Sequence, residues 1–178
     1  MKIGIIGAGY VGTVMTDHLL SVGHRVTVLD KFIYGHNQCV LPYLGREGYK
    51  FVYGDLRDPK ALSSALSDAS NVILLAGLVG DPITKKYPET SAEINEKGVI
   101  NCIDSLNGVG LKKLIFVSTC SNYGLLSEND LASEETDLKP LSLYAKAKVD
   151  AEKYLLGLNG DYATKIAKPY LLSGAVAL

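Results

Sequence analysis

Lys2-Ile3-Gly4-Ile5-Ile6-Gly7-Ala8-Gly9-Tyr10-Val11-Gly12 is the stretch that decides the fold. Its first five residues form a short apolar run, which predicts a buried strand. Three glycines follow in G-x-G-x-x-G spacing. Gly7 permits a tight turn, Gly9 lets the backbone approach a pyrophosphate, and Gly12 lets the next helix pack closely on the sheet. That helix is expected over 10–21, with its positive N-terminal end facing the phosphates. The stretch therefore predicts dinucleotide binding, and a tight turn without a ligand is the alternative.

An acidic residue follows the second expected strand. The segment Arg25-Val26-Thr27-Val28-Leu29 predicts this strand, and Asp30 comes directly after it, 18 residues beyond Gly12. A carboxylate at this place accepts hydrogen bonds from the ribose hydroxyls of an adenosine and repels a 2′-phosphate. The sequence therefore predicts NAD as the cofactor in preference to NADP, although the cation of Lys31 stands beside the acid.

The rest of the chain alternates between expected strands and helices. The third strand is expected before Val52, and further strands are expected over 71–75 and 113–117. Helices are expected over 59–66, 89–106 and 142–156. Alternating βαβ units require a parallel sheet with helices on both faces. The expected fold class is α/β, a Rossmann-type doubly wound parallel sheet with strand order 3-2-1-4-5-6. Long loops are expected over 31–48 and 80–88, at the mouth of the cofactor cleft.

A candidate catalytic pair lies in the last expected helix. Tyr144 and Lys148 are four residues apart and therefore share one helical face. A free tyrosine has a pKa of about 10 and is a poor base at neutral pH. A lysine ammonium one turn away would stabilise the phenolate and lower that pKa. An ordinary surface pair is the alternative, and Tyr-x-x-x-Lys by itself would favour it.

Two further segments strengthen the catalytic interpretation. Ser118-Thr119-Cys120-Ser121-Asn122-Tyr123-Gly124 follows the strand expected over 113–117. Ligands bind at the carboxyl ends of parallel strands, so a hydroxyl here is placed to bond a substrate oxygen. Asp55 follows the third strand and is placed to reach an adenine amino group. We interpret Cys120 as a small packing residue and not as a nucleophile, because no histidine is near it in the sequence.

These motifs, in this order, resemble the extended short-chain dehydrogenase/reductase family, the NAD-dependent nucleotide-sugar epimerases and dehydratases, in its N-terminal half. Asn95-Glu96-Lys97-Gly98 and Lys168-Pro169 are similar to two further family motifs. The resemblance assigns catalysis to Thr119, Tyr144 and Lys148, and Tyr144 comes 25 residues after Thr119, which matches the family spacing. It implies a cofactor site formed by Gly7, Gly9, Tyr10, Val11, Gly12, Asp30, Lys31, Asp55, Leu56, Leu75, Ala76, Gly77, Asn95, Tyr144, Lys148 and Pro169.

One departure from the family narrows the expected reaction. Its 4,6-dehydratases carry Asp-Glu after the catalytic Thr, where this chain has Cys120 and Ser121. Neither side chain can act as the carboxylate acid and base that water elimination needs. We therefore expect an NAD-dependent epimerase, or a dehydrogenase or reductase, acting on a nucleotide-sugar or a related hydroxyl or keto substrate. The alternative is a non-catalytic NAD(P)-binding sensor, which would have no need of an activated phenol.

Length sets the expected domain organisation. The chain has 178 residues, about the size of one domain, whereas members of the family are commonly nearly twice as long. We expect residues 1–178 to form the NAD-binding domain and the C-terminal substrate lobe to be absent from this chain. The full-length protein is expected to be a homodimer.

Composition argues against several other classes of protein. A net charge of −1 provides no basic surface for nucleic acid, and no run reaches the ~18 apolar residues of a membrane helix. The N-terminus reads as a strand and not as a signal peptide. Three cysteines without C-x-x-C spacing predict neither a disulfide framework nor a zinc site. We interpret His18, His24 and His36 as surface or loop residues, expect no metal, and expect a cytoplasmic protein.

Overall fold

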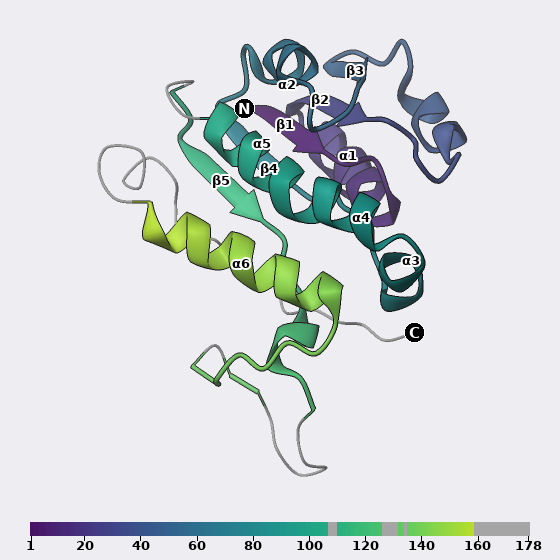
Figure 1. Ribbon diagram of the computed structural model, residues 1–178. Coiled ribbons are helices and arrows are strands. Elements are labelled where there is room, and N and C mark those ends of the chain that lie inside the picture. The colour runs from purple at the N-terminus through teal and green to yellow at the C-terminus, as the bar shows by residue number, and fades with distance from the viewer. Residues whose placement is uncertain (107–109, 126–131, 134, 159–178) are drawn as a thin grey trace.

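The computed structural model describes residues 1–106, 110–125, 132–133 and 135–158. Within them lies a five-stranded parallel sheet with the order β3-β2-β1-β4-β5 (Figure 1). The strands are β1 (Lys2–Ile6), β2 (Arg25–Asp30), β3 (Tyr49–Tyr53), β4 (Asn71–Leu74) and β5 (Lys113–Phe116). This confirms the expected fold class and the order of these five strands. The expected sixth strand, before Lys168, falls outside the described residues.

Helical segments connect the strands. They are α1 (Tyr10–Ser21), η1 (Asn37–Tyr43), α2 (Pro59–Leu66), α3 (Asp81–Lys86), α4 (Pro88–Ser91), η2 (Ala92–Gly98), α5 (Val99–Ser105), η3 (Cys120–Tyr123) and α6 (Leu143–Gly157). The predicted limits of α1 and α2 are confirmed. The prediction of loops over 31–48 and 80–88 is wrong in part, because η1 lies within the first segment and α3 within the second. Each short helix has a reason to form: Val40 and Tyr43 of η1 are buried, and Pro82 stands in the first turn of α3.

Two helices begin at side-chain caps that are visible in the sequence. The Asp58 carboxylate accepts a hydrogen bond from the Lys60 N–H at 2.9 Å, and Pro59 occupies the first turn of α2. The Ser142 hydroxyl oxygen accepts from the Ala145 N–H at 3.1 Å and starts α6. The Ser142 cap determines where the helix that carries Tyr144 begins.

The helix expected over 89–106 forms, but its middle is wider than an α-helix. Residues Ala92–Gly98 are π-helical, between α4 and α5. Such segments commonly accompany functional sites. Here the wide turn carries the buried side chain of Asn95, which bonds the segment after β4. Hydrophobic periodicity does not encode this change of pitch, because both helix types keep their apolar face on the sheet.

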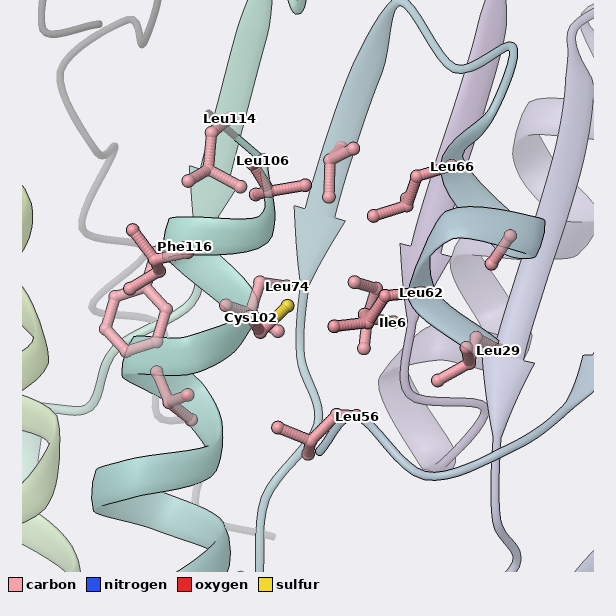
Figure 2. Packing of buried hydrophobic residues seen from close by; sticks show 14 of the residues in the cluster. Ile6, Leu29, Leu56, Leu62, Leu66, Leu74, Cys102, Leu106, Leu114 and Phe116 are labelled. Atoms are coloured by element: carbon pink, nitrogen blue, oxygen red, sulfur yellow. The ribbon is translucent and has the colours of Figure 1, made fainter. Parts of the chain in front are cut away.

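Buried apolar residues cover both faces of the sheet. On one face, Ile6, Leu74 and Phe116 from β1, β4 and β5 pack against α2, the η2–α5 segment and α6. Figure 2 shows part of this cluster, including Leu62 and Leu66 of α2 over the strands. On the other face, side chains of α1 and η1 pack against Ile3, Ile5, Val26 and Val28. Helices on both faces leave the carboxyl edge of the sheet open for a ligand.

Candidate cofactor and active site

A cavity of about 850 Å³ lies at the carboxyl ends of the five strands. Each strand contributes the residues that follow it: residues 7–14 after β1, residues between Leu29 and Cys39 after β2, 54–56 after β3, residues between Leu75 and Val79 after β4, and 117–120 after β5. Ile94 of η2 and Tyr144 and Lys148 of α6 complete the lining. Because parallel strands end at the same edge, segments far apart in the sequence form one site.

The glycine turn is tight at two positions and open at the third. Gly7 has a φ of +113°, and a Cβ there would lie 2.8 Å from the Ala76 nitrogen. A Cβ at Gly12 would lie 2.0 Å from the Gly7 carbonyl oxygen. A Cβ at Gly9, by contrast, would meet no atom within 4 Å among the described residues. The turn therefore leaves open space beside the N-terminus of α1, which suits an anionic pyrophosphate.

Asp30, at the end of β2, stabilises this turn through hydrogen bonds. Its carboxylate accepts hydrogen bonds from the Ala8 N–H at 2.6 Å and the Phe32 N–H at 2.5 Å. His36 lies beside it, with 3.8 Å between Nε2 and Oδ1. Asp30, His36 and Tyr34 all line the cavity. His36 lies in the loop before η1, as expected, and is half-buried at the edge of the site.

Asp55 makes four hydrogen bonds within the protein. Oδ1 accepts from the Arg57 backbone N–H and Nε at 2.9 Å each, and Oδ2 accepts from Arg57 Nη2 at 2.7 Å and Lys31 Nζ at 3.0 Å. The bonds from Arg57 hold the pKa of the Asp55 carboxyl well below its usual range. A carboxylate has about four lone-pair sites, so an adenine amino group would compete with Lys31 for this side chain. The adenine contact of Asp55 stays a prediction.

Asn95 supports the cavity wall from behind. Its Oδ1 accepts from the Leu78 N–H at 2.7 Å, and its Nδ2 donates to the Leu78 carbonyl oxygen at 2.9 Å and to Ser91 Oγ at 3.2 Å. The neighbouring Leu75, Ala76 and Gly77 line the cavity, whereas Asn95 is buried and does not. The bonds to Leu78 give Asn95 a supporting position, and its contact with the cofactor stays a prediction.

The segment after β5 brings a hydroxyl and a thiol to the cavity. The Thr119 hydroxyl oxygen accepts from the Ser121 N–H at 3.2 Å and starts η3. Cys120 is exposed and lines the cavity next to it. The interpretation of Cys120 as a packing residue is wrong. The turn into η3 directs the residue away from the core, which neither its size nor its neighbours in the sequence predict.

Tyr144 and Lys148 share one face of α6, as predicted. Lys148 Nζ lies 5.8 Å from the centroid of the Tyr144 ring and 4.5 Å from that of Phe116, and it donates to the Val117 carbonyl oxygen at 2.8 Å. Burial lowers the pKa of Lys148 from 10.5 to about 8. Burial, and then the nearby Tyr34, raises the pKa of Tyr144. The expected lowering of the tyrosine pKa is not met in this structure, because burial raises it.

A buried polar cluster lies one turn further along α6. Glu152 is 4% exposed and accepts hydrogen bonds from the Ser118 hydroxyl and from Asn122 Nδ2, the latter at 2.7 Å. Burial raises the pKa of Glu152, and its charge in turn opposes the lowering of the Lys148 pKa. The cluster joins α6 to the segment that carries Thr119. Sequence reasoning missed it, and the only signal is the further four-residue step from Lys148 to Glu152.

Comparison with known proteins agrees with this geometry. A model of the NAD dependent epimerase/dehydratase family matches residues 3–175. The chain belongs to this family. The predicted resemblance to the extended short-chain dehydrogenases/reductases is thereby confirmed.

Relatives within the family are named as sugar-nucleotide epimerases. The chain is 31% identical over 169 residues to the UDP-glucose 4-epimerase of Lacticaseibacillus casei, covering 93% of this chain and 49% of the relative. It is 30% identical over 183 residues to UDP-arabinose 4-epimerase 1 of Arabidopsis thaliana, covering 95% and 42%. The UDP-glucose 4-epimerase of Thermus thermophilus, solved as a complex with NAD, superposes with a TM-score of 0.79 at 28% identity, covering 88% of this chain and 50% of that one. The chain thus spans about half the length of the curated relatives it matches.

Most of the predicted site residues meet at this cavity. Those that line it are Gly7, Gly9, Tyr10, Val11, Gly12, Asp30, Lys31, Asp55, Leu56, Leu75, Ala76, Gly77, Thr119, Tyr144 and Lys148. Asn95 lies behind the wall, and Pro169 lies outside the described residues. Among the residues that the structure describes, no group of three or more His, Cys, Asp and Glu side chains could hold a metal ion. In the same part of the chain, no helix has the length and apolar character needed to cross a membrane.

Proposed function

We propose that this chain is the cofactor-binding part of an NAD-dependent enzyme that epimerises, oxidises or reduces a nucleotide-sugar or a related hydroxyl or keto substrate. One observation carries the proposal: the cavity that contains the glycine turn and Asp30 also contains Thr119, Tyr144 and Lys148. The relatives named as UDP-sugar 4-epimerases, and the solved relative in complex with NAD, support this interpretation of the cavity.

The residues present fit a dinucleotide. The open space at Gly9 and the N-terminus of α1 suit the pyrophosphate, and Asp30 has the position for the adenosine ribose. In this assignment Lys148 holds the ribose of the nicotinamide, at the opposite end of the cavity from Asp55. When bound, NAD supplies the hydride acceptor that this chain's own side chains lack.

Proton transfer falls to Tyr144. As the phenolate, it takes the proton from a substrate hydroxyl group while the carbon beneath that group is oxidised, and the resulting phenol returns the proton when the carbonyl is reduced. The raised pKa of Tyr144 keeps the phenol protonated, so a nearby cation is required to stabilise the phenolate. Lys148 is the cation in reach, and Thr119 orients the substrate oxygen. In an epimerase the ketone turns over between two such steps, whereas a dehydrogenase or reductase releases it.

The candidate function of a different class is a non-catalytic NAD(P)-binding sensor. It would use the same glycine turn and Asp30 but would gain nothing from a buried Lys148 with a half-buried Tyr144 and Thr119 around the cavity. We favour the enzyme because burying the amine of Lys148 beside Tyr144 costs free energy, and catalysis is the function that explains this cost.

We also propose that the nucleotide-sugar is held mainly by a second lobe, and that the active protein is a homodimer. The support for a second lobe is the greater length of the relatives. Residues 1–178 alone should then bind NAD but turn over nucleotide-sugar poorly, because the substrate is not held in a reactive geometry.

The test uses the 178-residue chain. Calorimetric titration should show NAD binding, and UDP-glucose added at high concentration should slowly produce the absorbance of reduced nicotinamide. Tyr144→Phe should bind NAD and lose the slow reduction. NAD binding without any Tyr144-dependent reduction would favour the sensor, and no NAD binding at all would remove both functions. Fast conversion of UDP-glucose by this chain would contradict the second lobe and leave the enzyme assignment intact.

A further inference from the structure

We propose that Asp55 helps to select NAD over NADP by holding Lys31 away from the position of a 2′-phosphate. The inference rests on the proposed function. It assigns to Asp55 an effect on cofactor choice, exerted through Lys31, that differs from direct recognition of adenine.

Lys31 is a cation at the place where NAD and NADP differ, and it would favour the 2′-phosphate of NADP. It follows Asp30 directly and lines the same cavity, at the end of β2. A cation near this place is what accommodates the 2′-phosphate in NADP-binding sheets of this type. The side chain of Lys31 is 46% exposed and therefore has the freedom to turn toward a ligand. Repulsion by Asp30 alone would be offset by this neighbouring cation.

Asp55 counters Lys31 from the next strand. Lys31 Nζ lies 3.0 Å from Asp55 Oδ2, and this pair joins the segments that follow β2 and β3. The carboxylate is 18% exposed, less than half the exposure of the lysine, so Asp55 is the fixed partner and Lys31 the movable one. Within this pair, the carboxylate of Asp55 neutralises the ammonium of Lys31. The attraction between that ammonium and a 2′-phosphate is therefore weaker.

Arg57 makes Asp55 a rigid anchor. It donates three of the four hydrogen bonds to Asp55, two through its guanidinium and one through its backbone N–H. A two-pronged bond of this kind fixes the orientation of a carboxylate as well as its charge. The fourth bond then directs Oδ2 at Lys31. The three residues carry two cations and one anion, so removal of the Asp55 charge would leave Lys31 unpaired next to the ribose site.

The experiment measures the affinity of the 178-residue chain for NAD and for NADP by calorimetry. Asp55→Asn keeps the shape of the side chain and removes its charge. It should raise the affinity for NADP relative to NAD by about five-fold, which corresponds to about 1 kcal/mol, the upper size of an exposed ion pair. The double variant Lys31→Met/Asp55→Asn should lose this gain. Lys60→Met removes an exposed lysine that does not line the cavity and serves as the control for loss of one positive charge.

Each result decides between explanations. An unchanged ratio in an Asp55→Asn protein that still binds NAD would overturn the inference. A gain that persists in the double variant would overturn the role of Lys31. Equal losses of NAD and NADP affinity would assign Asp55 to adenine. If Asp55→Asn does not fold, as judged by thermal unfolding, Asp55→Ser removes the same charge and takes its place. Failure of the unaltered chain to bind either cofactor would instead disprove the proposed function.

Discussion

Lys148 donates a hydrogen bond to the Val117 carbonyl oxygen, with 2.8 Å between Nζ and O. This bond joins the middle of α6 to the segment directly after β5. It places a buried cation between the strand end that carries Thr119 and the helix face that carries Tyr144. The proposed catalytic groups are therefore connected through a backbone carbonyl, and the charge of Lys148 is shared between that oxygen and the neighbouring rings.

Tyr144→Phe should abolish nearly all nucleotide-sugar turnover, by about 10²-fold or more, in a form of the protein that has the activity. It removes the proton-transfer group and keeps the ring, so NAD affinity should stay within a few-fold of the unaltered protein. Paired kinetic and calorimetric measurements check this. Tyr154→Phe on the same helix is the control, because that hydroxyl bonds Asp104 and does not line the cavity. Substantial activity in Tyr144→Phe would require a different base.

Lys148→Met should weaken NAD binding and turnover together, because the cation is assigned to both the cofactor ribose and the phenolate. The expected loss of NAD affinity is about ten-fold, the size of one charge-assisted hydrogen bond. Lys146→Met is the matched control: it lies two residues away on α6 and is exposed. If both variants lost affinity equally, the effect would be one of general charge and not of position.

The pH dependence of stability should report the buried lysine. Its pKa is about 8 in the folded chain, below the ordinary value of 10.5, so folding favours the neutral amine. The unfolded chain binds more protons between these two values, and stability should rise with pH there. The destabilising contribution is fully present below pH 8 and disappears above pH 10.5. Unfolding temperatures across this range, taken as the difference from Lys148→Met, isolate the effect, and a difference that does not change with pH would contradict it.

Asp30→Ala should reduce the preference for NAD over NADP and also destabilise the fold. The first effect follows from loss of the carboxylate that repels a 2′-phosphate. The second follows because the N–H groups of Ala8 and Phe32 lose their acceptor, at a cost of about 1–3 kcal/mol. Cofactor titrations and thermal unfolding measure the two separately, with Asp150→Ala on the exposed side of α6 as the control. Equal or tighter binding of NADP by the unaltered chain would disprove this role of Asp30.

Asn95→Ala should destabilise the chain by about 2 kcal/mol or more, because both backbone groups of Leu78 lose a buried partner. NAD affinity should fall as well, since the segment from Leu75 to Gly77 loses its support. Asn101→Ala, an exposed asparagine on α5, provides the matched control. Thermal unfolding and NAD titration test the pair. A variant with unchanged stability and weaker NAD binding would instead indicate direct contact with the cofactor.

Local signals predicted much of the fold. The limits of α1 and α2 follow from the glycine turn, from the Asp58 cap and from the Pro at the first helical position. The strands follow from short apolar runs, and their order is the one typical of a Rossmann-type doubly wound sheet. The widened turn at Ala92–Gly98 and the short helices η1 and α3 did not follow, because they depend on packing partners distant in the sequence.

By itself, the sequence determined a parallel sheet, a glycine turn and a set of polar residues at the strand ends, since turn chemistry, periodicity and spacing are local properties. Only the tertiary structure decided how each polar group is used. Asp55 is engaged by Arg57 and Lys31, Asn95 supports Leu78, and Cys120 faces the cavity. Burial also decided the proton affinities of Tyr144 and Lys148. The physical reason is that hydrogen-bond partners and desolvation come from other segments of the chain, which meet only when the sheet has formed.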